Sequence, residues 1–172
     1  MSLTYPEDVE GTKFSTYANQ PVTKIGDRSI IAFRTQNSNV ECRVFVTGIC
    51  TEPGYAYILQ DPTITTPAGI QNKIVNRRLG CIKTSTVSDL NGAEGTCTFL
   101  DLIESTKISG GAEISKMPIG GGNGGAPVVA GGKGGMSPFL LAPGKVYAFV
   151  LESVVNIPHL HWGRVEWREI FR

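Results

Sequence analysis

Residues Lys145–Val155 read KVYAFVLESVV, and this run of β-branched, aromatic and aliphatic residues begins directly after the turn dipeptide Pro143-Gly144. Val, Tyr and Phe favour strands, while Pro next to Gly marks a turn. Val40–Cys50 (VECRVFVTGIC) carries a second strand signature, because its valines and Cys42 alternate with Glu, Arg and Phe. Both stretches therefore predict β-strands, and the alternation in the second predicts one buried face and one exposed face.

Similar strand patterns occur along the rest of the chain. Further short runs rich in Val, Ile, Thr and aromatic residues are separated by turn signals such as Asp61-Pro62 and Asn91-Gly92. Amphipathic runs of helical period are absent, and eight to ten short strands without helices are typical of an antiparallel β-sandwich or jelly roll. The sequence therefore predicts an all-β fold. The further runs are Arg28–Arg34, Tyr55–Leu59, Gly69–Val75, Leu79–Val87, Thr96–Ile103 and Leu160–Phe171.

The length of 172 residues suits one domain, with residues 28–172 as the β-sandwich. Residues 1–27 are polar and interrupted by Pro and Gly, and their aromatic side chains follow neither a strand nor a helix period. We therefore expect an extended N-terminal arm that caps its own domain or reaches a neighbouring protein. The aromatic residues of this arm are Tyr5, Phe14 and Tyr17.

Glycine is concentrated in one stretch. Between Gly110 and Gly135 lie 11 of the 21 glycines, around a small apolar island that contains Val128 and Val129. Glycine loses the most backbone entropy on ordering, so we expect a long loop over about 110–135 and no packed strand or helix. The hexamer Gly120–Gly125 matches the dinucleotide-binding spacing, but it lacks the preceding strand, the following helix and the acidic residue that such a site needs.

The charge pattern argues against nucleic acid and membranes as partners. The formal net charge is +1, and no apolar run reaches the roughly 18 residues of a membrane span. The first residues have neither the basic nor the apolar part of a signal peptide, so a soluble protein that is not exported is expected. The densest basic patch contains Arg77 and Arg78, and it predicts a solvated edge or a protein contact.

The four cysteines are spaced without a C-x-x-C pair. Cys42 shares the alternating face of Val40, Val44 and Val46, so we expect reduced cysteines that act as small core residues. A disulfide or a ligand role is the alternative. The cysteines are Cys42, Cys50, Cys81 and Cys97.

His159-Leu160-His161 followed by Glu166 resembles part of a cupin metal motif. The motif is incomplete, because no third histidine follows, and both imidazoles are instead expected to face solvent or a partner. No G-x-S-x-G nucleophile motif is present, and the paired carboxylates fit cross-strand ion pairs. The sequence thus predicts no enzyme, no cofactor and no metal, with His159, His161 and Glu166 as the candidate ligands if a metal is bound.

The order of several segments resembles virion structural proteins of tailed bacteriophages, especially jelly-roll capsid decoration (cement) proteins. The similarity covers roughly residues 70–172, and the long Gly-rich insertion departs from that family. The segments that carry it are Asn76–Gly80, Ile108–Ile114, Leu140–Tyr147, Val155-Asn156 and Val165–Glu169.

The resemblance implies a non-enzymatic protein on the capsid exterior that is assembled in the host cytoplasm, binds the major capsid protein shell, and forms a homodimer or homotrimer. Alternatives are a tail, neck or head-fibre component and a carbohydrate-binding β-sandwich module, in which Trp162, Trp167, Tyr55 or Tyr57 stacks on sugar rings. A cupin-like metalloenzyme is a more distant alternative. The arm, the basic patch and the Gly-rich stretch supply the residues expected to bind partners: Tyr5, Phe14, Tyr17, Arg77, Arg78, Gly121, Asn123, Val128, Val129 and Lys133.

Overall fold

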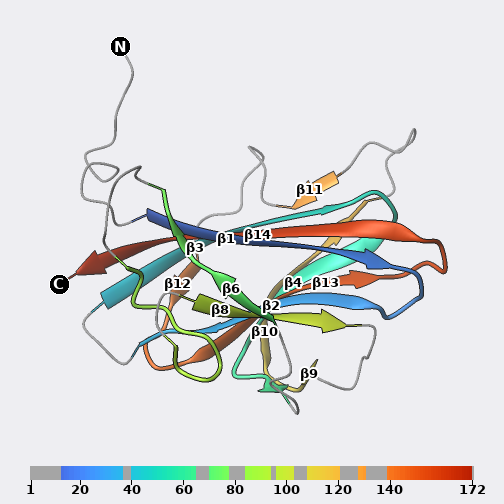
Figure 1. Cartoon of the computed structure of the whole chain (residues 1–172). Helices are drawn as coiled ribbons and strands as arrows, with labels where there is room; N and C mark the ends of the chain where they lie inside the picture. Colours follow the sequence, from blue (N-terminus) through green and yellow to red (C-terminus); the bar gives the residue numbers. More distant parts are fainter. Residues whose placement is uncertain are drawn as a thin grey trace.

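The computed structural model describes residues 13–36, 40–64, 70–77, 84–93, 96–102, 108–120, 128–130 and 139–171. Within these residues all regular structure is β, and Figure 1 shows two layers of strands with no helix. The predicted all-β, antiparallel sandwich is confirmed. The strands are β1 (Lys13–Val22), β2 (Arg28–Arg34), β3 (Val40–Cys50), β4 (Gly54–Gln60), β5 (Thr63–Ile64), β6 (Ile70–Lys73), β7 (Val75–Asn76), β8 (Thr96–Leu102), β9 (Ile108–Ser109), β10 (Ala112–Ile119), β11 (Val128–Ala130), β12 (Phe139–Leu141), β13 (Val146–Ser153) and β14 (His159–Phe171).

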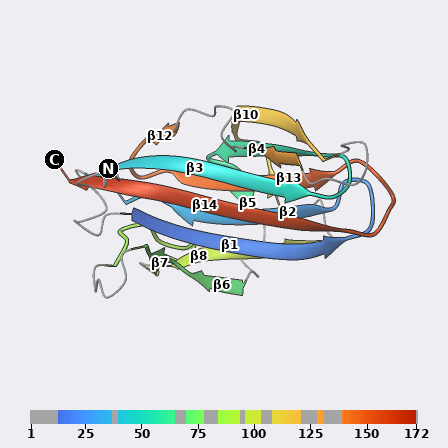
Figure 2. The same cartoon turned by 90° about the horizontal axis from the view of Figure 1, so that it is seen from above.

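The strands form two six-stranded sheets and one short ribbon. Sheet A has the order β11-β3-β14-β1-β7, with β12 also paired to β3, and sheet B has the order β10-β4-β13-β2-β8-β6. The ribbon joins β5 to β9. In Figure 2, which looks down on sheet A, β3, β14 and β1 lie side by side in the upper layer.

The pairing of the strands is nested. β1 pairs with β14, β2 with β13, β3 with β12 and β4 with β10, all antiparallel. The first four strands also alternate between the sheets, with β1 and β3 in sheet A and β2 and β4 in sheet B. The chain between β4 and β10 adds β6 and β8 to the edge of sheet B and β7 to the edge of sheet A.

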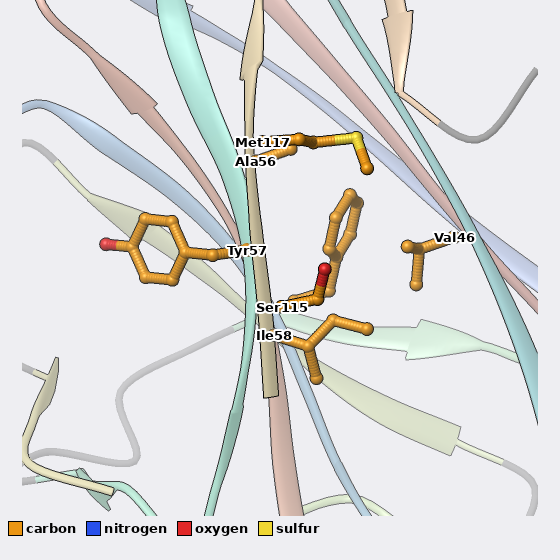
Figure 3. Close-up of a pocket in the computed structure, with 7 residues that line it drawn as sticks. Val46, Ala56, Tyr57, Ile58, Ser115 and Met117 are labelled. Carbon is orange, nitrogen blue, oxygen red and sulfur yellow. The ribbon is translucent and has the colours of Figure 1, made fainter. Parts of the chain in front are cut away.

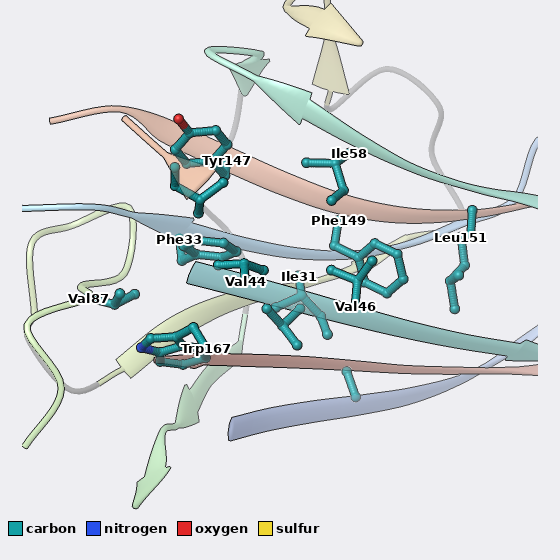
Figure 4. Packing of buried hydrophobic residues seen from close by; sticks show 14 of the residues in the cluster. Ile31, Phe33, Val44, Val46, Ile58, Val87, Tyr147, Phe149, Leu151 and Trp167 are labelled. Atoms are coloured by element: carbon teal, nitrogen blue, oxygen red, sulfur yellow. The ribbon is translucent and has the colours of Figure 1, made fainter. Parts of the chain in front are cut away.

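The main core lies between the sheets (Figure 4). Phe33 of sheet B stacks on Trp167 of sheet A with ring centroids 6.2 Å apart, and on Tyr147 with centroids 6.0 Å apart. Aromatic pairs at this separation add to the free energy of burial. Toward the other end of the core, Gly48 of β3 is paired with Gly163 of β14. Phe149 and Leu151 of sheet B pack against both glycines.

A second apolar cluster covers the outer face of sheet B. Ile30 and Ala32 of β2 and Ala148 and Val150 of β13 are fully buried there, against Tyr57, and Ile108 of the β5–β9 ribbon joins them. Strands β2 and β13 are therefore buried on both faces, whereas β1, β3 and β14 alternate between buried and exposed residues. Such alternation is the mark of a sheet with one open face.

The prediction of an extended arm over residues 1–27 is wrong for residues 13–22, which form a strand of the sandwich. Lys13–Val22 forms β1, which pairs with β14 along its whole length. The apolar alternation is hidden in the sequence because two of its inward side chains are polar: Thr16 and Gln20 are buried. Residues 1–12 lie outside the described residues.

The loop expected over about 110–135 is also wrong in part. Ala112–Ile119 forms β10, which pairs with β4, and Val128–Ala130 forms β11, which pairs with β3. Pro118 lies within β10, which is the last strand of sheet B, and an edge strand tolerates a missing N–H. The predicted strand over Leu79–Val87 is wrong in its described part, because residues 84–87 are not in a strand.

Candidate interaction surface

The outer face of sheet A is formed by every second residue of β1, β14 and β3. The strand register sets these side chains in rows across the three strands, so that Tyr17 lies opposite Arg164 and Arg164 opposite Thr47. Side chains directly opposite each other on one face lie close enough to interact. The next rows on either side are Asn19, Trp162 and Ile49, and Ser15, Glu166 and Phe45.

Aromatic and aliphatic side chains are exposed on this face. Tyr17 is 64% exposed and Phe45 is 46% exposed, while Trp162, on β14 in the row next to that of Tyr17, is half-buried. Leu160 lies exposed near one end of the face, and Leu140 lies exposed on β12 near the other. Exposed apolar side chains that gather on one face mark interaction sites more often than scattered ones do.

The charges of the same face are mostly positive. Glu166 is shared by Arg77 and Arg164, with 2.8 Å between the Arg164 guanidinium and the carboxylate, and Arg43 pairs with Glu41 at 2.8 Å. Lys13 and Arg168 lie on this face too, so five cations accompany two carboxylates. The face is thus more positive than the whole protein, whose formal net charge is +1.

Two of the residues predicted to bind partners lie on this face, namely Tyr17 and Arg77. Val128 and Val129 belong to β11, at the edge of the same sheet, opposite Cys50 and Ile49. Phe14 was wrongly placed among them: it is 2% exposed and stacks on Trp167 with centroids 6.1 Å apart, because it points into the sandwich. Tyr5, Arg78, Gly121, Asn123 and Lys133 lie outside the described residues.

His159 and His161 do not face solvent or a partner, contrary to expectation. Both are buried on the inner face of β14, and their Nε2 atoms are 3.2 Å apart. Glu166 lies half-buried on the outer face, because an offset of five residues in a strand reverses the side. The three predicted ligands therefore do not form one metal site, and no group of three His, Cys, Asp or Glu in the described ranges does so.

Hydrogen bonds fix the tautomers of the histidine pair. The Nδ1 atom of His159 lies 2.6 Å from the Ile157 carbonyl oxygen, so Nδ1–H donates and Nε2 accepts from Nε2–H of His161. The remaining ring atom, Nδ1 of His161, lies 3.1 Å from the Ser29 hydroxyl, which donates to it. Burial, and secondly the neighbouring His159, lower the pKa of His161 to about 4, so the ring is neutral at pH 7.

A buried carboxylate, Glu169, closes the opposite end of the sandwich, although the sequence assigned it with Glu166 to cross-strand ion pairs. Glu169 is 1% exposed and accepts hydrogen bonds from the Ser85 hydroxyl, from the Thr86 amide at 3.0 Å and from the Trp167 indole N–H at 3.2 Å. These bonds hold residues 85–86 against the core and explain how an acidic residue can occupy an inward position.

The two described cysteine side chains match the expectation of reduced core residues. Cys42 and Cys50 are free and buried. Burial raises the pKa of Cys50 to about 12, and burial together with the charge of Glu169 raises the pKa of Cys42 further. Both thiols stay protonated at neutral pH and are poor nucleophiles.

The sandwich contains a small apolar gap between β3, β4, β10 and β13 (Figure 3). It measures about 10 Å³ and is lined by Val46, Ile58 and Met117, among others, while Tyr57 points to the other side of β4. A gap of this size holds at most a water molecule. The outer face of sheet A is therefore a stronger candidate for function than this gap.

No family model, no curated protein and no solved structure matches the chain. Among the residues placed by the structure, no helix of the length and apolarity needed to cross a membrane is found.

Proposed function

We propose that this protein is a non-enzymatic virion structural protein of a tailed bacteriophage, a decoration protein that binds the outside of the major capsid protein shell through the outer face of sheet A. The observation that carries the proposal is the contrast between the two outer faces. Sheet B is covered by its own apolar cluster, whereas sheet A exposes Tyr17 and Phe45 among charged residues. An aromatic and arginine-rich patch is typical of protein interfaces.

The strand order supports a jelly roll as the finer description of the fold. Nested pairing of four early strands with four later ones, distributed over two sheets, is how a long antiparallel hairpin rolls into a sandwich. Jelly rolls occur in viral capsid proteins, lectins and cupins, so the fold alone does not select the function. The resemblance of residues 70–172 to decoration proteins favours the first of these.

Assembly as a homodimer or homotrimer on the capsid exterior belongs to the same proposal. Many copies on a closed shell add weak contacts into strong binding, so a moderate patch on each copy suffices. Carbohydrate binding is less favoured, because two of its four candidate aromatic residues, Trp167 and Tyr57, are buried.

The proposal is tested by cosedimentation with expanded, undecorated capsids. The wild-type protein should bind, and Tyr17→Ser with Phe45→Ser should lose most of the binding while the melting temperature changes little, because both side chains are exposed. The matched control is Tyr55→Ser, whose side chain is 38% exposed on sheet B and should leave binding unchanged. Absence of wild-type binding, or specific binding to tails in its place, would overturn the capsid assignment.

A further inference from the structure

Three chain connections lie together at the end of the sandwich that is farther from the C-terminus (Figures 1 and 2). They are residues 23–27 between β1 and β2, residues 51–53 between β3 and β4, and residues 154–158 between β13 and β14. In sheet A, β14 lies between β3 and β1, and in sheet B, β13 lies between β4 and β2. The β13–β14 connection is therefore the middle one of the three, with one connection on each side of it.

Hydrogen bonds join the three connections into one unit. The Ile25 amide donates to the Asn156 side chain at 3.0 Å, and the Val154 amide donates to the Pro53 carbonyl oxygen at 3.3 Å. The β1–β2 connection is also held from within, because the buried Asp27 carboxylate accepts hydrogen bonds from two of its backbone amides. A surface that is ordered before binding loses less conformational entropy when a partner binds.

The middle of this end is apolar. Ile25 is 61% exposed and Ile157 is 49% exposed, and Val154 is exposed beside them in the sequence of the middle connection. Residues 154–158, with the sequence VVNIP, contain no charged side chain. Exposed aliphatic side chains that gather at one place mark a surface that binds another molecule.

The two outer connections carry opposite charges. Lys24 is exposed in the β1–β2 connection, and Glu52 is half-buried in the β3–β4 connection. Within the part of the chain that the structure describes, neither side chain takes part in an ion pair. The remaining charged residue of the three connections, Asp27, is buried. This end of the sandwich therefore has a positive side, an apolar middle and a negative side.

We propose that this end binds the same end of a second copy, as a homodimer about a twofold axis parallel to the normal of the sheets. A half-turn about such an axis exchanges the two sides, so that Lys24 of each copy meets Glu52 of the other and the apolar middles pack together. A twofold axis along the row of connections would instead place Lys24 against Lys24. Such reciprocal contacts, in which one patch binds itself, are what a twofold interface requires.

This dimer rests on the proposed function in one respect, because it supplies the contact of the homodimer that the proposed function includes. An axis along the sheet normal leaves the outer faces of sheet A of both copies pointing in the same direction, so both can dock on one shell. The outer face of sheet A is unsuitable as the dimer contact, because it would bring two positive surfaces together. The end of a sandwich is small, so the dimer belongs to the weak class of interfaces, and salt should weaken it further.

The test measures the dissociation constant of the free, full-length protein by sedimentation equilibrium, without shells. Lys24→Glu and Glu52→Lys, made singly, place like charges at both symmetry-related contacts and should raise the dissociation constant about tenfold. The double variant with both changes restores opposite charges and should return it to within about threefold of the wild-type value. Ile157→Ser should also weaken the dimer, whereas the control Leu140→Ser removes an exposed side chain of β12 and should not.

A wild-type protein that stays monomeric at every concentration would overturn the dimer. Single variants that associate as strongly as the wild type, or a double variant that associates as weakly as the single ones, would do the same, and a mass of three copies would overturn the twofold axis. The shell assay is separate, because the single variants keep Tyr17 and Phe45. Loss of the dimer with intact shell binding concerns this contact alone, whereas an intact dimer without shell binding concerns the proposed function alone.

Discussion

His161 shows how a single buried side chain ties the stability of the sandwich to pH. Its ring accepts from Ser29 and donates to His159, and its pKa is about 4 in the folded protein against an ordinary value of 6.5. Between these values the unfolded chain binds the proton more readily than the folded one. The contribution of neutral His161 to the free energy of unfolding is therefore fully present above pH 6.5 and is lost as the pH falls toward 4.

The expected loss is about 3 kcal/mol between pH 6.5 and 4, because the pKa falls by about 2.5 from its ordinary value. Urea unfolding at a series of pH values measures it. The variant His161→Asn cannot titrate in this range, so it should show a much shallower slope. A wild-type unfolding free energy that stays flat over this range would contradict the assignment.

Glu169 is the second residue whose role depends on complete hydrogen bonding. Glu169→Ala leaves the Ser85 hydroxyl and the Thr86 amide without their acceptor and leaves the Trp167 N–H with the Ser85 oxygen alone, and each buried donor that loses its partner costs about 1–3 kcal/mol. We expect a loss of about 3 kcal/mol or more in the unfolding free energy. The exposed Glu113→Gln should change it by less than about 0.5 kcal/mol. Similar effects in both variants would show that Glu169 is not held as described.

The sequence predicted the buried position of Cys42, but it placed His159 and His161 on the wrong face of their strand. The valine alternation of β3 already places Cys42 on its inner face. His159 and His161 share a side in any strand, but their polarity suggested the outer one, and only the pairing with β1 and the contact with Ser29 place them inside. The odd offset between His161 and Glu166 in a predicted strand was sufficient to separate them.

Among the elements, β2 and β3 have the bounds that their sequences predict, whereas β1 and β10 were missed. A strand with an apolar face and turns at both ends can be recognised locally. β1 buries Thr16 and Gln20, and β10 is an edge strand between glycines with Pro118 inside it. Both elements exist because a neighbouring strand supplies the pairing, which local sequence does not contain.

β3 packs closely against sheet B at Gly48. A Cβ atom on Gly48 would lie 2.5 Å from Leu151 Cδ2, whereas one on Gly163 would lie 3.4 Å from its nearest atom, on Phe149. Gly48→Ala should therefore lower the unfolding free energy by about 1–3 kcal/mol, as overpacked cores do. Gly163→Ala, on the facing strand, serves as the control and should change it by less than half as much. Equal losses would mean that the sheets do not approach each other as closely as described.

For the molecule as a whole, the important asymmetry is that one outer face is covered and the other open. The β5–β9 ribbon contributes Ile108 to the outer side of sheet B, where it packs with Tyr57 in a second core. Sheet A has no such cover among the described residues, and its alternating strands carry aromatic and positive side chains outward. The class of fold followed from composition and pattern, but which face is open depends on long-range pairing.

We propose that the outer face of sheet A docks on a capsid shell. The most direct measurement is the mass of undecorated shells titrated with the protein, which gives the number of bound copies at saturation. We expect saturation at a fixed multiple set by the symmetry of the shell, together with loss of bound mass in the Tyr17→Ser, Phe45→Ser variant. Shells whose mass does not increase, or increases equally with the variant, would contradict it.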